Sequence, residues 1–202
     1  MSFLTERCTF SVFSEEIIKR SDPFDFGHKD INDFFKHDSP KYSKELLGKS
    51  YCFVLDENPN IIVCAFTISN DSIKANFLPN NRKRKITKRI SREKHFRSYP
   101  AVLIGRLGVN KEFRHNNIGS ELMDFIKSWF IDPNNKTGCR FVVVDSYNEE
   151  KPLNYYKKNQ FEFLFSSEEQ ESDYTGQELP LITRLMYFDL IVLSADFVPT
   201  DT

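Results

Sequence analysis

The chain has 202 residues and a net charge of −1 at pH 7, with 40% hydrophobic and 28% charged residues. This is the composition of one folded domain over residues 1–202, and it excludes a disordered or membrane-spanning chain. No apolar run approaches membrane-span length and the N-terminus lacks a signal-like apolar core, so we expect a cytoplasmic protein with no membrane partner. The four cysteines form no C-x-x-C pair and the four histidines show no ligand spacing, which predicts reduced cysteines and no metal site.

Hydrophobic periodicity predicts a mixed α/β fold in which strands and helices alternate along most of the chain. Strands are expected at residues 8–14, 50–55, 61–69, 100–109, 140–146, 161–165 and 183–190. Helices are expected at residues 25–37, shortly after Pro40, and at residues 82–97, 118–130 and 151–159. Residues 70–81 are expected to be irregular, and the acidic residues 166–180 to form an exposed hairpin excursion.

The most informative stretch is residues 102–120, where a buried strand leads through a polar turn into an amphipathic helix. Free N–H groups and the positive end of the helix dipole make such a turn a favourable place for phosphate. Arg114 would add a charged fork of donors, and Gly119 would let a ligand approach the backbone closely. An ordinary strand–turn–helix with a polar N-terminus would share these features, so the residues alone leave both interpretations open.

The turn Arg114-His115-Asn116-Asn117-Ile118-Gly119 resembles the Arg/Gln-x-x-Gly-x-Gly/Ala signature of the GNAT acetyltransferases. Asn117 replaces the first Gly, and Asn is the non-Gly residue that best tolerates a positive φ. The predicted element order also matches GNAT topology over nearly the whole chain. The resemblance implies a single GNAT-type acyl-CoA N-acyltransferase domain with a splayed central mixed sheet flanked by helices, and acetyl-CoA as acetyl donor. It assigns to the cofactor Leu107, Gly108, Val109, Arg114, His115, Asn116, Asn117, Ile118, Gly119, Ser120 and Asn148.

A second stretch, Tyr155-Tyr156-Lys157-Lys158-Asn159-Gln160-Phe161, resembles the GNAT element Phe/Leu-Tyr-x-x-x-Gly-Phe, with Gln160 at the Gly position. The resemblance implies that Tyr156 protonates the leaving thiolate, while a backbone N–H near residues 107–109 polarises the thioester carbonyl. Tyr155 is the alternative acid, because adjacent helical residues point about 100° apart. Both tyrosines also suit a plain aromatic core. The general base stays open between Glu149, Asp145 and a water molecule.

Residues 24–35, Phe-Asp-Phe-Gly-His-Lys-Asp-Ile-Asn-Asp-Phe-Phe, resemble the Phe-Asp-Cys-Gly-Asn-x-x-Leu-Asp-x-Phe-Leu opening of GNAT toxins from bacterial toxin–antitoxin pairs. Phe26 replaces the Cys and His28 the Asn. The resemblance implies aminoacyl-tRNA as the amine acceptor and an antitoxin as a partner. The same residues also fit a helix N-terminus with Asp25 as its cap and Phe24 packed against the first turn.

A basic segment occupies residues 82–97, which we expect to form a helical insertion. Nine of these sixteen residues are Lys or Arg and one is acidic, in a chain of net charge −1. Such a local field favours a phosphate backbone, although a solvated helix face would look the same. The candidate nucleic-acid contacts are Arg82, Lys83, Arg84, Lys85, Lys88, Arg89 and Arg92.

The sequence therefore predicts an acetyl-CoA-dependent N-acetyltransferase acting on a primary amine, with the amino group of aminoacyl-tRNA as the leading acceptor. One alternative is a small-amine or protein N-acetyltransferase. Another is a degenerate, non-catalytic domain that binds CoA or a partner, since Asn117 and Gln160 depart from the family motifs. Aromatic residues near the C-terminus leave room for a homodimer.

Overall fold

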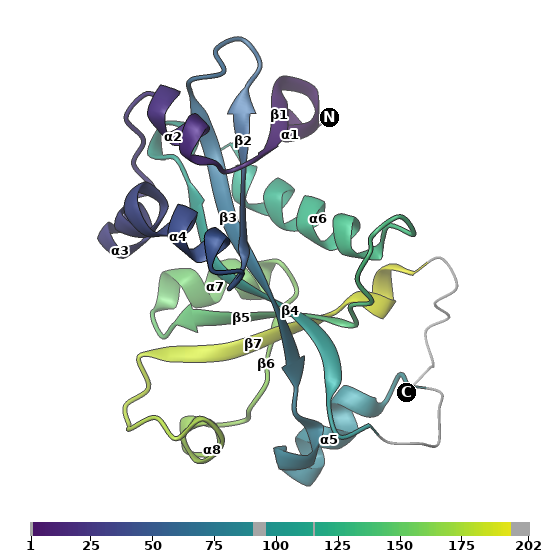
Figure 1. Ribbon diagram of the computed structural model, residues 1–202. Helices are drawn as coiled ribbons and strands as arrows, with labels where there is room; N and C mark the ends of the chain where they lie inside the picture. Colours follow the sequence, from purple (N-terminus) through teal and green to yellow (C-terminus); the bar gives the residue numbers. More distant parts are fainter. Residues whose placement is uncertain (1, 91–95, 115, 195–202) are drawn as a thin grey trace. The chain divides into compact units, whose positions relative to one another are not determined.

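The computed structural model describes residues 2–90, 96–114 and 116–194 (Figure 1). The strands are β1 (Cys8–Val12), β2 (Lys49–Leu55), β3 (Ile62–Ile73), β4 (Tyr99–Val109), β5 (Phe141–Tyr147), β6 (Glu162–Phe163) and β7 (Thr183–Asp189). The α-helices are α1 (Phe3–Arg7), α2 (Glu15–Arg20), α3 (Lys29–Asp33), α4 (Ser39–Lys44), α5 (Asn80–Thr87), α6 (Ile118–Ile131), α7 (Glu150–Lys158) and α8 (Glu168–Thr175). Shorter helical turns are η1 (Phe34–Asp38), η2 (Ala75–Phe77), η3 (Lys111–Phe113) and η4 (Leu190–Leu193).

The strands form a seven-stranded sheet in the order β1-β2-β3-β4-β5-β7-β6, which confirms the predicted mixed α/β class. The chain divides into two compact units, and strands β3 and β4 contribute to both. Unit 1 holds the residues up to 69 together with 104–126, and unit 2 holds 70–103 and the residues from 127 onward. We describe each unit by itself.

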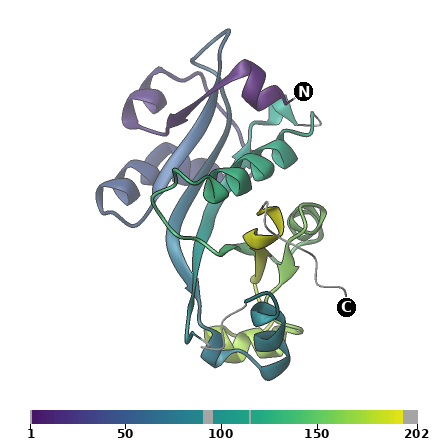
Figure 2. The same cartoon turned by 90° about the vertical axis from the view of Figure 1, so that its right-hand side faces the viewer.

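In unit 1, the antiparallel strands β1, β2 and β3 are covered on both faces (Figures 1 and 2). On one face, the ring of Phe125 from α6 lies 4.8 Å from Phe10 and 4.9 Å from Phe53, measured between centroids. On the opposite face, Cys52, Val54 and Ala65 join a buried cluster with the aromatic residues of the segment from Phe13 to Phe35. Alternation along the strands therefore separates an α6-facing side from a side that faces α2 and η1.

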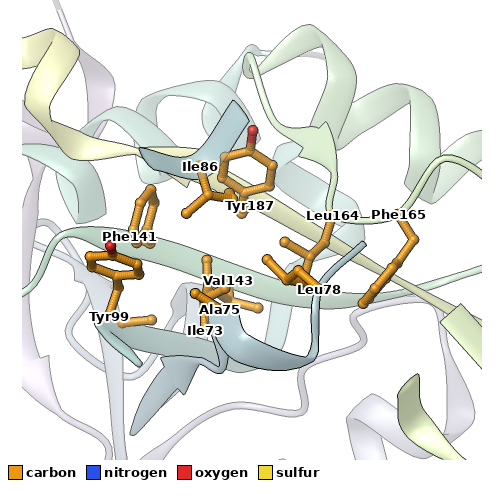
Figure 3. Packing of buried hydrophobic residues seen from close by; sticks show 11 residues of the cluster. Ile73, Ala75, Leu78, Ile86, Tyr99, Phe141, Val143, Leu164, Phe165 and Tyr187 are labelled. Carbon is orange, nitrogen blue, oxygen red and sulfur yellow. The ribbon is translucent and has the colours of Figure 1, made fainter. Parts of the chain in front are cut away.

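Unit 2 is built on the antiparallel pair β5–β7, with Val143 opposite Tyr187 in the register. Figure 3 shows the core formed on this pair, where Phe141, Val143 and Tyr187 meet residues from η2, α5 and β4. Ile86 is the buried residue of α5, at 2% exposed, and it packs this strongly basic helix against the core. Many of the aromatic side chains of the chain are thus buried in the cores of the two units.

The acidic residues 166–180 were predicted as a hairpin excursion, and this is wrong, because residues 168–175 form helix α8. The Ser167 hydroxyl caps the helix by accepting the Gln170 N–H, and acidic residues fill the first turn. Gly176 ends the helix at φ +73°. These are ordinary helix start and stop signals, and they outweigh the loop-like composition.

Helix α5 is shorter than the predicted basic helix at residues 82–97. It starts at Asn80 and ends at Thr87, and residues 91–95 lie outside the described residues. Residues 70–81 are also more regular than expected, since β3 continues to Ile73 and η2 follows at once.

Candidate functional site

The predicted cofactor turn lies in unit 1, between the end of β4 and the start of α6. Asn110 anchors it at the strand end: its N–H donates to Val63 O (2.9 Å), and its side-chain amide donates to Ile62 O (3.0 Å). At the helix start, Asn117 O accepts the N–H groups of Ser120 (2.9 Å) and Glu121 (3.1 Å). The turn is therefore fixed at both ends by backbone acceptors.

Asn117 adopts φ +60°, the left-handed conformation that a Gly would take at this position. The replacement of the family's Gly thus leaves the backbone geometry of the turn in place, as its tolerance of positive φ predicts. Next to it, Ile118 is 1% exposed and seats the first turn of α6 in the core. Asn116 and Gly119 flank these two residues, and His115 lies outside the described residues.

Arg114 connects the cofactor turn to the toxin-like segment at residues 24–35. One guanidinium nitrogen donates to the carbonyl of Phe26, and the group lies directly over Gly27. A Cβ added at Gly27 would sit 2.5 Å from Arg114 Nη2, and Gly27 also has φ +73°. The positive φ and the close approach of Arg114 both favour Gly there, and Arg114 retains further N–H donors for an anionic ligand.

Asp25 forms a second link between residues 24–35 and the segment that leads into the cofactor turn. Its carboxylate lies 2.7 Å from Lys111 Nζ and accepts hydrogen bonds from Asn32 Nδ2 (2.8 Å) and Gly27 N (2.6 Å). The Lys111 bond, then those from Asn32 and Gly27, hold the pKa of the Asp25 carboxyl well below its ordinary range. Asp25 is therefore not the helix cap expected as one alternative, because helix α3 begins only at Lys29.

The central strand meets this segment at Gly108. A Cβ there would lie 2.5 Å from the ring of Phe26, which is 2% exposed. The Phe that replaces the family's Cys therefore packs directly on the backbone of β4. The neighbouring residues Leu107 and Val109 are both half-buried.

Tyr156 lies in unit 2, in the last turns of α7. The helix ends in a Schellman motif: Phe161 N donates to Tyr156 O (3.0 Å) and Gln160 N to Lys157 O (2.9 Å). Gln160 adopts φ +65°, so the second departure from Gly also keeps the left-handed backbone. The ring of Phe161 lies 5.4 Å from that of Tyr156, and burial raises the pKa of the Tyr156 phenol strongly.

A buried lysine that the sequence analysis did not single out supports this turn. Lys127 is 3% exposed, donates from Nζ to Asn159 O (2.7 Å) and lies 3.9 Å above the ring of Phe188. A cation at the C-terminal end of α7 suits the helix dipole, and the ring contact supplies further stabilisation. The amphipathic pattern of α6 marks this position as buried, but nothing in it indicates what the ammonium group binds.

Asn148 is a predicted cofactor residue that lies in unit 2, and its polar groups form hydrogen bonds within the fold. Its side-chain amide donates to Glu168 Oε1 and to Leu181 O, both at 3.0 Å, and its N–H donates to Ile182 O (2.8 Å). The Asn148 hydrogen bond and the Leu181 N–H lower the pKa of Glu168. Asn148 thus joins the end of β5 to α8 and to the segment before β7.

The basic segment divides into two sets of side chains. Arg82 donates to the carbonyls of Phe163 and Leu164, Lys85 pairs with Glu162, and Arg89 lies 3.9 Å from Asp189. By contrast, the side chains of Lys83, Arg84 and Lys88 form no hydrogen bond or ion pair with another described residue. Arg92 lies outside the described residues. Three of the seven predicted nucleic-acid contacts therefore serve the fold of unit 2.

The structure brings together the predicted cofactor residues of β4, the turn and the start of α6 within unit 1. Asn148, Tyr156 and the basic segment belong to unit 2. Within the described ranges, no three His, Cys, Asp or Glu side chains are grouped to hold a metal ion. No described helix is both long and apolar enough to cross a membrane.

The fold defined by these elements is that of GNAT-type bacterial toxins. A structure of AtaT complexed with acetyl-methionyl-tRNAfMet is similar at a TM-score of 0.64 and 16% identity, over 92% of this chain and 96% of that one. A tyrosine-to-phenylalanine mutant of KacT matches at a TM-score of 0.63 and 15% identity, over 93% and 98% of the two chains. A structure of AtaTR bound with acetyl-CoA matches at a TM-score of 0.60 and 14% identity, over 93% of this chain and 96% of that one. The sequence itself matches no protein-family model and no curated protein.

Proposed function

We propose that this protein is an acetyl-CoA-dependent N-acetyltransferase that acetylates a primary amine, with aminoacyl-tRNA as acceptor. The observation that carries the proposal is the backbone at Asn117 and Gln160. Both residues replace a Gly of the motifs, and both keep a positive φ, at 60° and 65°. Gln160 ends α7 and Asn117 precedes α6, so both turns keep the backbone that the proposed acid and cofactor sites need.

In this proposal, the turn of unit 1 holds the acetyl donor. The backbone N–H groups at the start of α6 and the positive end of its dipole suit a pyrophosphate, and Arg114 adds charged donors. The Asp25–Lys111 pair and the Arg114–Phe26 hydrogen bond keep the turn and the toxin-like segment together before a ligand arrives. This preorganisation reduces the entropy that binding must offset.

Acetyl-CoA supplies an activated thioester, the substrate amine attacks its carbonyl carbon, and the thiolate leaves. We assign the proton donor for that thiolate to Tyr156, because its spacing to Phe161 matches the motif and a phenol is protonated at neutral pH. A backbone N–H of residues 107–109 would polarise the carbonyl. The free amine form of the acceptor serves as the nucleophile, with Glu149, Asp145 or water as its base.

For the acceptor, Lys83, Arg84 and Lys88 are the predicted nucleic-acid contacts within the described ranges that bind no other described residue, and we assign them to tRNA. The similar AtaT structure contains acetyl-methionyl-tRNAfMet, and another shows AtaT bound to the C-terminus of the antitoxin AtaR. We extend both kinds of partner to this protein as proposals. A small or protein amine is the alternative acceptor, favoured by the structural use of Arg82, Lys85 and Arg89.

Adjacent tyrosines provide a matched test of the chemistry. Tyr156→Phe keeps the ring contact with Phe161 and removes the hydroxyl, so we expect kcat to fall by about 10²- to 10⁴-fold with little change in stability. Tyr155→Phe is the control and should retain turnover. If the two variants behave in the reverse way, Tyr155 is the acid, and if neither loses activity, the assignment is wrong.

Cofactor binding is tested separately from catalysis. Acetyl-CoA at a hundred times its Kd should stabilise the protein by about 2.7 kcal/mol, measured from the shift in unfolding. Arg114→Gln should weaken this stabilisation, whereas Tyr156→Phe should leave it unchanged. Absence of any stabilisation of the unmodified protein would instead support a degenerate interaction domain.

A further inference from the structure

A cavity of about 520 Å³ lies within unit 2, apart from every residue assigned above to acetyl-CoA or to catalysis. One wall comes from η2 and the start of α5, and the other from α8. The lining side chains used below are Lys74, Phe77, Pro79, Gln170, Asp173 and Tyr174. Its size exceeds that of one nucleobase, and its walls combine rings with polar groups.

Phe77 is the unusual member of this lining, because its side chain is 67% exposed. It stands on a well-ordered turn, in which Phe77 N donates to Lys74 O (3.1 Å) and Asn76 N donates to Arg97 O (3.3 Å). On the opposite wall, the ring of Tyr174 is held by Phe165, with the ring centroids 4.8 Å apart. A fixed, exposed ring at a cavity is a ready stacking surface for a planar ligand.

The polar lining supplies both kinds of hydrogen-bonding group that the edge of a nucleobase needs. Asp173 offers acceptors and Lys74 offers donors. Gln170 Oε1 accepts the Ser166 N–H at 3.3 Å, which leaves its amide nitrogen to donate. A purely apolar ligand would leave these groups without partners, so the lining favours a flat, polar heterocycle.

The two walls of the cavity differ in charge, with Lys74 on one and Asp173 on the other. Helix α5 follows directly from Pro79 and carries Lys83 and Arg84, whose side chains bind no other described residue. On the other wall, α8 contributes the carboxylate of Asp173 to the lining. A ligand that bears phosphate is therefore attracted to the α5 side and repelled by the α8 side.

We propose that this cavity binds one unpaired nucleotide of an RNA chain, with its base stacked on Phe77 and its phosphates directed toward Lys83 and Arg84. The identification of that RNA as the substrate tRNA rests on the proposed function, whereas the binding site itself does not. The site provides a reason for the exposed Phe77 that precedes a helix carrying Lys83 and Arg84.

The test is fluorescence anisotropy of a labelled single-stranded RNA oligonucleotide with the full-length protein at several salt concentrations. Phe77→Ala should weaken binding about tenfold without changing the salt slope, and Phe77→Trp should restore it, because stacking contributes about 1–3 kcal/mol per base. Lys83→Gln and Arg84→Gln should each weaken binding and reduce the slope by about one. Ile182→Ala is the control, since Ile182 is 78% exposed and lies outside this lining.

Unchanged RNA affinity in Phe77→Ala, an equal loss in Ile182→Ala, or no RNA binding by the unmodified protein would each overturn the site. Acetyl transfer is measured in parallel on a small amine and on charged tRNA. Phe77-dependent RNA binding without transfer to charged tRNA would retain the site and reject the proposed acceptor. Transfer to charged tRNA that is indifferent to Phe77→Ala, with unchanged oligonucleotide binding, would reject the site and retain the acceptor.

Discussion

Among the residues that the structure describes, three other than Gly adopt a positive φ, and replacing them by Gly should change stability in a predictable order. They are Leu46 at 60°, Asn117 at 60° and Gln160 at 65°. The left-handed conformation costs an ordinary L-residue roughly 1–2 kcal/mol. Gly avoids this cost but loses about 0.5–1 kcal/mol more backbone entropy on folding. The balance predicts a stabilisation of about 0.5–1 kcal/mol at a position where the side chain contributes nothing else.

Leu46 and Gln160 meet that condition, because Leu46 is 89% exposed and Gln160 is also exposed. Leu46→Gly and Gln160→Gly should therefore each stabilise the protein. Asn117→Gly should change stability by less than either, because Asn already tolerates this conformation. Alanine at the same positions retains the Cβ and the strain, so it serves as the matched control.

The measurement is equilibrium unfolding in urea, followed by the fluorescence of the single tryptophan, Trp129. The expected order of stability is Gly above Ala at positions 46 and 160, with a smaller difference at 117. If Gly is no more stable than Ala at both Leu46 and Gln160, the left-handed strain that underlies the account of both motifs is refuted.

Three further results are expected. Arg184→Met should destabilise the protein by about 3 kcal/mol in urea unfolding. The variant removes the Arg184 partner, 2.8 Å away, from the carboxylate of Glu171, which is 2% exposed. Adding Glu171→Met to this variant should recover part of the lost stability. The lowered pKa of Asp25 means that its stabilisation is present above about pH 4 and is lost as the pH falls below that, so melting temperatures of Asp25→Asn should decline less steeply toward pH 3. Burial raises the pKa of Tyr156, so kcat/KM should show no descending limb near pH 10, where a phenol of ordinary pKa would titrate.

Each of these has an outcome that contradicts it. An Arg184→Met variant as stable as the unmodified protein would mean that the buried pair is not a pair in solution. Parallel acid slopes for the Asp25→Asn variant and its parent would remove the carboxylate from the turn contacts. A falling limb near pH 10 that disappears in Tyr156→Phe would show a phenol of ordinary pKa.

The sequence was sufficient where hydrophobic periodicity is strong. Strands β2 to β5 and helix α6 lie close to their predicted positions because their apolar residues follow one clear period. Helix α8 was missed because its residues are acidic and nearly uniform in polarity, so no apolar face marks it. The decisive signals were the cap residues Ser167 and Gly176 at its two ends.

The sequence predicted the motifs of the site, but not the hydrogen bonds and ion pairs between residues far apart in the chain. The positive φ at Asn117 was expected from the Gly of the resembled motif together with the tolerance of Asn for this conformation. The bond from Lys111 to Asp25 joins residues far apart in sequence, as does that from Arg114 to Phe26. In the same way, local charge could not reveal that Arg82 is bound to backbone carbonyls around residue 163. Pairings of this kind depend on the finished fold.

The most direct test of the central claim is acetyl transfer to tRNA. Purified protein is incubated with radiolabelled acetyl-CoA and a pool of aminoacylated tRNA, with uncharged tRNA and a small primary amine as parallel acceptors. The account predicts label on the charged pool only, strongly reduced in Tyr156→Phe and in a variant with Lys83, Arg84 and Lys88 neutralised. Label on the small amine and none on charged tRNA would contradict the proposed acceptor, and label on none of them would contradict the proposed enzyme.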